Sequence, residues 1–196
     1  MARACPQDEP RRWKDHAQDC WHVQITQGAA YVTADPREVL TTVLGSCIAA
    51  CIRDPASGVG GMNHFLLAQG RGADRDAARY GVNAMELLIN GILAKGGVRA
   101  RLEAKLFGGA NVIAGLSDVG SSNAAFAARF LADEGIALVG GDVGGVFPRR
   151  VQFWPASGRA RQRALPNAGG ASLVAREMAA ADQDLANRQE DGVELF

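Results

Sequence analysis

Reactive side chains are scarce in this sequence, whose 196 residues include four cysteines and three histidines. Cys47 and His64 are the two whose surroundings best suit catalysis. Cys47 follows Gly45 and Ser46, and such small residues let a substrate approach the backbone, whose N–H groups can stabilise a developing oxyanion. A neighbouring imidazolium stabilises the thiolate, which is the reactive form of cysteine. The pair is therefore a candidate for nucleophilic catalysis by Cys47 with His64 as its partner. The alternative is that Cys47 is a small buried apolar residue, and composition and spacing do not decide between the two.

A hairpin is the element that could position this pair. Residues 39–67 have the pattern of two extended apolar segments joined by a turn at residues 54–58. A four-residue turn places Cys47 opposite His64, with Cβ atoms about 4.5–5.5 Å apart. A five-residue turn places His64 opposite Ile48 instead. The contact therefore depends on a register that the sequence leaves open.

Helical and strand periodicities alternate along the rest of the chain. Helices are predicted over 76–95 and 123–134, and strands over 99–107, 136–139, 151–154 and 159–165. Because hairpins dominate over β–α–β units, we expect an α+β fold. Its architecture would be a layered α/β sandwich, with a mixed or antiparallel sheet and packed helices.

Three regions are predicted along the chain. Residues 1–22 are polar and contain prolines, which is typical of a mobile tail. Residues 23–165 form the single catalytic domain. Residues 166–196 are interpreted as a linker followed by a peripheral C-terminal helix over 172–187 and a tail.

Charge and hydropathy exclude several classes of partner. Lys and Arg (21) balance Asp and Glu (21), so the chain lacks the broad basic field used in nonspecific nucleic-acid binding. Arg149 and Arg150 lie near Phe153 and Trp154, but we interpret them as the edge of a strand. The N-terminus lacks the apolar core of a signal peptide, and no apolar run is long enough to cross a bilayer. We expect a cytoplasmic protein with reduced cysteines, no membrane insertion and no nucleic-acid partner.

Metal binding is a weaker interpretation of the same residue types. Cys51 lies four positions after Cys47, which is not CxxC spacing. His16, Cys20 and His22 have short spacing that could bind a metal, yet we assign them to the solvated N-terminal region. The sequence therefore predicts no metal and no cofactor.

Several ordered motifs run through the central part of the chain. They are Thr41-x-x-x-Gly45-Ser46-Cys47, Asp54-Pro55, Gly61-Met62-Asn63-His64-Phe65, the run LEAKLFGGA at 102–110, Gly144-Gly145 and Arg149-Arg150-Val151. Together they resemble the CheD family of chemoreceptor glutamine deamidases, over roughly residues 24–165. Two positions depart from the family pattern: Ser122 stands where an Arg is common, and Pro148 where a Gly is common.

The resemblance implies a cysteine hydrolase acting in chemotaxis adaptation. Cys47 would be the nucleophile, His64 the catalytic histidine and Thr41 a third site residue that orients the imidazole. Backbone groups of Gly45 and Ser46 would hold the oxyanion. The implied fold is that of the cytotoxic necrotizing factor deamidases. The implied partners are the cytoplasmic helices of methyl-accepting chemoreceptors and, in many systems, a CheC-type phosphatase.

A different function class remains open at this level. A catalytically idle scaffold could bind receptors or a CheC-type phosphatase through its helices and residues 192–196. Such a protein would bind receptors without deamidating them.

Overall fold

The computed structural model describes residues 10–67, 74–111 and 119–166. The strands are β1 (Arg12–Asp15), β2 (Cys20–Gln24), β3 (Ala30–Thr33), β4 (Glu38–Leu44), β5 (Ile48–Arg53), β6 (Gly60–Asn63), β7 (Glu103–Gly108), β8 (Ala137–Val143), β9 (Arg149–Trp154) and β10 (Arg159–Ala164). The helices are α1 (Asp74–Ala94), α2 (Val119–Asp133) and a 3₁₀ turn, Arg99–Arg101. The predicted C-terminal helix over 172–187 lies outside the described residues.

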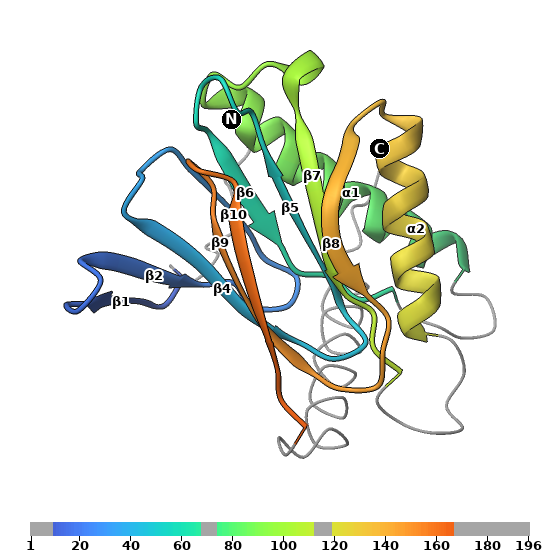
Figure 1. Cartoon of the computed structure of the whole chain (residues 1–196). Coiled ribbons are helices and arrows are strands. Elements are labelled where there is room, and N and C mark those ends of the chain that lie inside the picture. The colour runs from blue at the N-terminus through green and yellow to red at the C-terminus, as the bar shows by residue number, and fades with distance from the viewer. Residues whose placement is uncertain (1–9, 68–73, 112–118, 167–196) are drawn as a thin grey trace, which may run out of the picture.

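Two five-stranded sheets form the body of the fold (Figure 1). The outer sheet has the order β1-β2-β4-β9-β10, and the central sheet has the order β3-β6-β5-β7-β8. Each sheet is mixed, because β2–β4 and β7–β8 are parallel while the other pairs are antiparallel. The helices pack on the central sheet, which therefore lies between them and the outer sheet. This arrangement confirms the expected α+β class.

Strand β5 shows why the central sheet is buried on both faces. Its Ile48, Ala50 and Ile52 side chains pack with the helices. The alternate residues Ala49 and Cys51 pack into the core between the two sheets, which also contains Cys47. A strand with apolar residues on both faces reads as a continuous apolar run. That property explains why residues 39–53 look like one strand in the sequence.

The predicted strand over 39–53 is in fact two strands in different sheets. β4 belongs to the outer sheet and β5 to the central sheet, with residues 45–47 making the connection. Hydrophobic periodicity cannot detect this change, because both strands are buried. The two principal helices were predicted correctly in position, although α2 begins four residues earlier than expected.

The N-terminal segment requires a correction. Residues 1–22 were expected to form a mobile tail, yet β1 and part of β2 lie within them and join the outer sheet. Cys20 and His22 are buried there, and Trp13 stacks on His22 with ring centroids 5.1 Å apart. Polar composition concealed this hairpin, because its buried residues are few.

No helix among the described residues is long and apolar enough to cross a membrane.

Asp54 anchors the turn between β5 and β6. Its fully buried carboxylate accepts hydrogen bonds from the backbone N–H groups of Ala56 (2.9 Å) and Val98 (3.0 Å). Arg101 adds a salt bridge at 2.5 Å. The hydrogen bonds from Arg101 hold the pKa of the Asp54 carboxyl well below its usual range, against the opposing effect of burial. This one side chain connects the hairpin turn to the segment before β7.

We expect Asp54→Ala to lower the free energy of unfolding by about 1–3 kcal/mol, because it leaves buried N–H groups without acceptors. The contribution of a carboxyl with a depressed pKa is present above its unfolded pKa of about 4 and is lost as the pH falls below it. Urea unfolding at several pH values should therefore show the difference between the two proteins shrinking in acid. Asp35→Ala, which removes an exposed ion pair with Arg37, is the control and should have a smaller effect. An equal loss in both variants would contradict the assigned role of Asp54.

Candidate active site

Cys47 lies in the connection where the chain passes from β4 to β5. The carbonyl oxygen of Cys47 accepts a hydrogen bond from the N–H of Gly109 at 2.8 Å, and that of Gly45 accepts one from Ala110, also at 2.8 Å. The connection is thereby fixed against the end of β7. Cys47 itself is buried in the core between the sheets.

Gly108 permits this close contact. Its φ is +108°, a conformation that favours glycine, and a Cβ at this position would lie 2.1 Å from the carbonyl oxygen of Cys47. Any side chain would therefore displace the Cys47 peptide. The glycines at the end of the LEAKLFGGA motif are thus required by the geometry of the cysteine loop.

Asn123 of α2 connects the two halves of the site and was not identified from the sequence as a site residue. Its fully buried side chain donates from Nδ2 to the carbonyl of Ser46 at 2.9 Å. It also accepts, at Oδ1, the N–H of Leu67 at 2.9 Å. One amide group therefore fixes the loop that carries Cys47 relative to the segment that follows His64.

The backbone of the cysteine loop has a definite orientation. The carbonyls of Gly45 and Ser46 are hydrogen-bonded toward Ala110 and Asn123. In a planar trans peptide the next residue's N–H points the opposite way. The N–H groups of Ser46 and Cys47 are therefore directed away from the β7 end and α2. Adjacent backbone donors held in this way are the usual components of an oxyanion hole.

His64 lies opposite Ala49, which corrects the predicted register. Cys51 pairs with Met62, and an isolated bridge joins Ile48 to Phe65. The turn holds two residues more than the four-residue alternative that put Cys47 opposite His64. A shift by two residues keeps the same side chains on the same face. Cys47 and His64 therefore still face the outer sheet, as diagonal neighbours instead of direct partners.

Thr42 is the threonine that contacts the imidazole. Its Oγ1 lies 2.9 Å from Nδ1 of His64 and donates to the carbonyl of Ile25 at 2.8 Å. A hydroxyl has one proton, so with Ile25 as acceptor Thr42 accepts from Nδ1–H of the imidazole. The tautomer assigned from this network has its lone pair on Nε2. Among the residues that the structure describes, this buried Nε2 has no hydrogen-bond partner.

Thr41 does not reach His64. Successive residues of a strand point to opposite faces, so Thr41 and Thr42 cannot both face the central sheet. The hydroxyl of Thr41 donates to the carbonyl of Val151 at 3.2 Å. Both Thr41 and Thr42 are among the residues that line a cavity of about 310 Å³, which neither Cys47 nor His64 lines. In the structure, Thr42 and not Thr41 contacts the imidazole of His64.

Gln27 is a further residue that the sequence did not indicate. The thiol of Cys47 donates to its Oε1 at 3.6 Å. This carboxamide places a polar acceptor beside a thiol that lies in the core between the two sheets. Gln27 stands just after β2 in a segment without a periodic pattern, so no sequence signal marks it.

Cys51 has a different environment from Cys47. It is buried in the same core, and burial raises the pKa of its thiol far above the usual value. A raised pKa disfavours the thiolate form of Cys51, and its position in the same core makes it a matched control for substitutions of Cys47.

Burial also changes the imidazole. Complete desolvation lowers the pKa of His64 to about 4, and a backbone hydrogen bond to Ile25 opposes this effect. His64 is therefore neutral at neutral pH. Its Nε2 carries a lone pair, and the lowered pKa makes this nitrogen a weaker base than an exposed imidazole.

We predict that the imidazole of His64 titrates well below the usual value of about 6.5. Protonation of the folded state would become favourable only as the pH falls toward 4, so folding stability is lost between about pH 6.5 and 4. Two-dimensional NMR of ¹⁵N-histidine-labelled protein measures both the pKa and the tautomer. A His64 signal that titrates near 6.5, or that shows the proton on Nε2, would contradict this assignment.

The sequence is similar to several curated proteins over most of its length. A protein from Caulobacter vibrioides (strain CB15N) is 68% identical over 144 residues, which are 72% of this chain and 76% of the relative. Relatives from Caulobacter sp. (strain K31) and Sinorhizobium medicae are 63% and 60% identical over 153 and 146 residues. Those alignments cover 76% and 73% of this chain and 81% and 80% of the relatives. Each of the three bears the name "Probable chemoreceptor glutamine deamidase CheD".

Solved structures show only a distant likeness. A Neisseria meningitidis protein of the family DUF152 aligns with a TM-score of 0.38 and 13% identity, over 63% of this chain and 62% of that one. The hypothetical protein YfiH of Bacillus licheniformis aligns with a TM-score of 0.28 and 18% identity, over 40% and 26% of the two chains.

A family model also matches the chain. The model described as CheD chemotactic sensory transduction matches residues 66–164, a range that begins just after His64 and includes Gly108, Gly109 and Asn123. Together with relatives that are 60–68% identical over about three quarters of the chain, this match shows that the protein belongs to the CheD family.

Proposed function

We propose that this protein is a chemoreceptor glutamine deamidase that converts glutamine side chains of methyl-accepting chemoreceptors to glutamate through a thioester on Cys47. One observation supports the proposal. A buried, neutral imidazole, whose Nε2 has no partner among the described residues, faces the same core as a cysteine loop whose three carbonyls are hydrogen-bonded. The names of the relatives supply the substrate class.

The first step forms the thioester. Nε2 of His64 takes the proton of Cys47 as Sγ attacks the carboxamide carbon of the substrate. The N–H groups of the 45–47 loop hold the negative oxygen of the tetrahedral intermediate. The imidazolium then gives its proton to the departing nitrogen, and ammonia leaves.

The second step consumes water. Neutral His64 removes a proton from water, which attacks the thioester carbon and releases glutamate. The proton returns to Sγ, so the enzyme is restored. The balance is one glutamine side chain and one water converted to one glutamate side chain and ammonia, without a cofactor.

A neutral His64 favours one version of this chemistry. A preformed thiolate–imidazolium pair requires a charged imidazole in the resting enzyme, which complete burial disfavours. Proton transfer concerted with attack avoids that charged state. Thr42 keeps the proton on Nδ1 and so keeps Nε2 available as the base.

Further expectations belong to the same proposal. We infer that the fold resembles that of the cytotoxic necrotizing factor deamidases, since both would place a Cys–His pair in an α/β sandwich. A CheC-type phosphatase is the expected second partner. The site of action is the cytoplasm, where the receptor helices are found.

The deamidase proposal predicts that activity depends on Cys47 and not on Cys51. The protein is incubated with the cytoplasmic helical region of a chemoreceptor, and conversion of Gln to Glu is followed by peptide mass spectrometry. Cys47→Ala should lose more than the roughly 10²- to 10⁴-fold attributable to a general base alone. Cys51→Ala should retain activity. Conversion that persists in Cys47→Ala would exclude the mechanism, and receptor binding without conversion by the wild type would favour the scaffold function.

The contacts of the two threonines make a second prediction. Thr42→Val removes the partner of Nδ1 and should lower kcat by about 10- to 10²-fold with little change in KM, part of the effect of a general base. Thr42→Ser should restore it, because the hydroxyl is retained. Thr41→Val, the matched control, should have a smaller effect and leave the His64 NMR titration unchanged. A larger loss of kcat in Thr41→Val than in Thr42→Val would show that Thr41, not Thr42, orients the imidazole of His64.

A further inference from the structure

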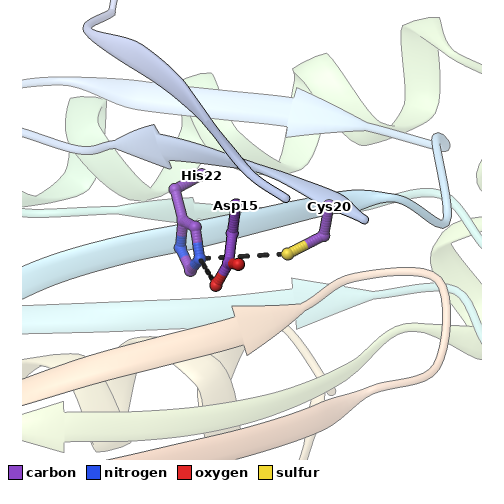
Figure 2. Close-up of side chains that lie close together, drawn as sticks. All are labelled: Asp15, Cys20 and His22. Atoms are coloured by element: carbon purple, nitrogen blue, oxygen red, sulfur yellow. Dashed lines mark hydrogen bonds and ion pairs between the residues drawn. The ribbon is translucent and has the colours of Figure 1, made fainter. Parts of the chain in front are cut away.

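A second group of reactive side chains lies in the N-terminal hairpin, away from the Cys47 site. Figure 2 shows Asp15, Cys20 and His22 pointing toward one another. Their ligand atoms all lie within 4.8 Å of one another. None of these residues has a role in the proposed deamidation.

The hairpin itself brings the three side chains together. Asp15 of β1 pairs directly with Cys20 of β2. His22 is two residues further along β2, so it shares a face with Cys20. This face looks away from the central sheet, because the alternate residue Val23 packs into the core between the sheets. The trio and Cys47 therefore lie on different sides of the outer sheet.

The separations are those of ligands around a common centre. Nε2 of His22 is 3.8 Å from Sγ of Cys20 and 3.8 Å from Oδ2 of Asp15. The nitrogen–oxygen distance exceeds the 2.7–3.2 Å of an N–H···O hydrogen bond. Tetrahedral zinc, with bonds of about 2.0–2.3 Å, separates its N, O and S ligands by roughly 3.3–3.6 Å. Small side-chain movements would convert the observed arrangement into a coordination site.

The arrangement does not fit a second catalytic triad. In a Cys–His–Asp triad the nucleophile and the carboxylate engage opposite nitrogens of the imidazole. Here both Sγ and Oδ2 approach the same atom, Nε2. Convergence on one side of the ring is expected for metal ligation.

The ligands are also held in place by their surroundings. Trp13 stacks on the ring of His22, with an angle of 11° between the planes. Oδ1 of Asp15 accepts the backbone N–H groups of Ala17 (2.9 Å) and Gln18 (3.2 Å), which directs Oδ2 toward His22. Cys20 is 6% exposed and His22 is 5% exposed. The other ring nitrogen of His22, Nδ1, is buried and has no hydrogen-bond partner among the described residues, so ring stacking and the Asp15 turn take the place of the second hydrogen bond that usually orients a metal-bound histidine.

We propose that Asp15, Cys20 and His22 form a Zn²⁺ site that closes the β1–β2 hairpin at the edge of the outer sheet. A thiolate, an imidazole and a carboxylate are a donor set that suits zinc, and water would complete a tetrahedral coordination. Binding releases the thiol proton of Cys20 to solvent. His16, which the sequence suggested as a ligand, is exposed in the turn and does not belong to the trio.

The test uses the full-length chain without a histidine tag, first stripped of metal with a chelator. Titration with Co²⁺ should give one ion per chain and a thiolate-to-cobalt charge-transfer absorption, which Zn²⁺ should abolish by displacement. Cys20→Ser should lose this absorption, while Cys47→Ser and Cys51→Ser should keep it. His22→Gln and Asp15→Asn should weaken Zn²⁺ binding by at least about 10-fold, the smallest effect usual for partners of a metal ligand.

A second measurement tests the role in the hairpin. Zn²⁺ should slow hydrogen exchange of the β1 amides in the wild type and have no effect in Cys20→Ser. Asp15→Asn keeps the oxygen that accepts the turn N–H groups, so it serves as the ligand variant if Cys20→Ser does not fold. A wild-type protein that binds neither ion, or a charge-transfer band that survives Cys20→Ser or disappears in Cys47→Ser, would overturn the proposal. Because deamidation is assayed separately, failure here leaves the function of Cys47 untouched.

Discussion

The site depends on the fixed backbone of residues 45–47, where the chain changes sheets. Gly109, Ala110 and Asn123 donate hydrogen bonds to the three carbonyls of this short connection. Because a peptide is planar, fixing the carbonyls also fixes the direction of the N–H groups and of the Cys47 side chain. The separate motifs at β7 and α2 therefore serve a common purpose, which is to hold the cysteine loop. A side chain at position 108 would collide with the carbonyl of Cys47, so this position also requires glycine.

Burial of the imidazole is the second constraint, and it follows from the layered fold. His64 lies between the sheets, where the charged form is disfavoured and the pKa falls to about 4. A buried base needs a defined tautomer, which Thr42 and the carbonyl of Ile25 supply. These bonds satisfy Nδ1, while Nε2 has no hydrogen-bond partner among the described residues. The same burial leaves Nε2 neutral and available for proton transfer.

Strands β2 and β4 connect the two regions of interest in this protein. They pair in parallel, with Gln24 opposite Thr41. The chain at β2 supplies His22 to the outward face, and just beyond its end the carbonyl of Ile25 reaches the Thr42 hydroxyl. A metal ion at the hairpin would thus stabilise the strand that also supports the imidazole. The two sites share a scaffold without sharing a residue.

Much of this could be read from the sequence alone. Periodicity located α1, α2 and β7 to β10 approximately. The strand predicted over 99–107 begins only at Glu103, because residues 99–101 form a 3₁₀ turn. The scarcity of histidine and cysteine singled out Cys47 and His64. Alternation could not separate Thr42 from Thr41, because Leu40 and Leu44 flank the first on one face of β4 and Val39 and Val43 flank the second on the other. Register, the change of sheets at residues 45–47, and the contacts of Gln27 and Asn123 were decided only by the tertiary structure. The physical reason is that these features depend on hydrogen bonds between segments far apart in the chain, and no local pattern of residues records which distant partner a backbone group will find.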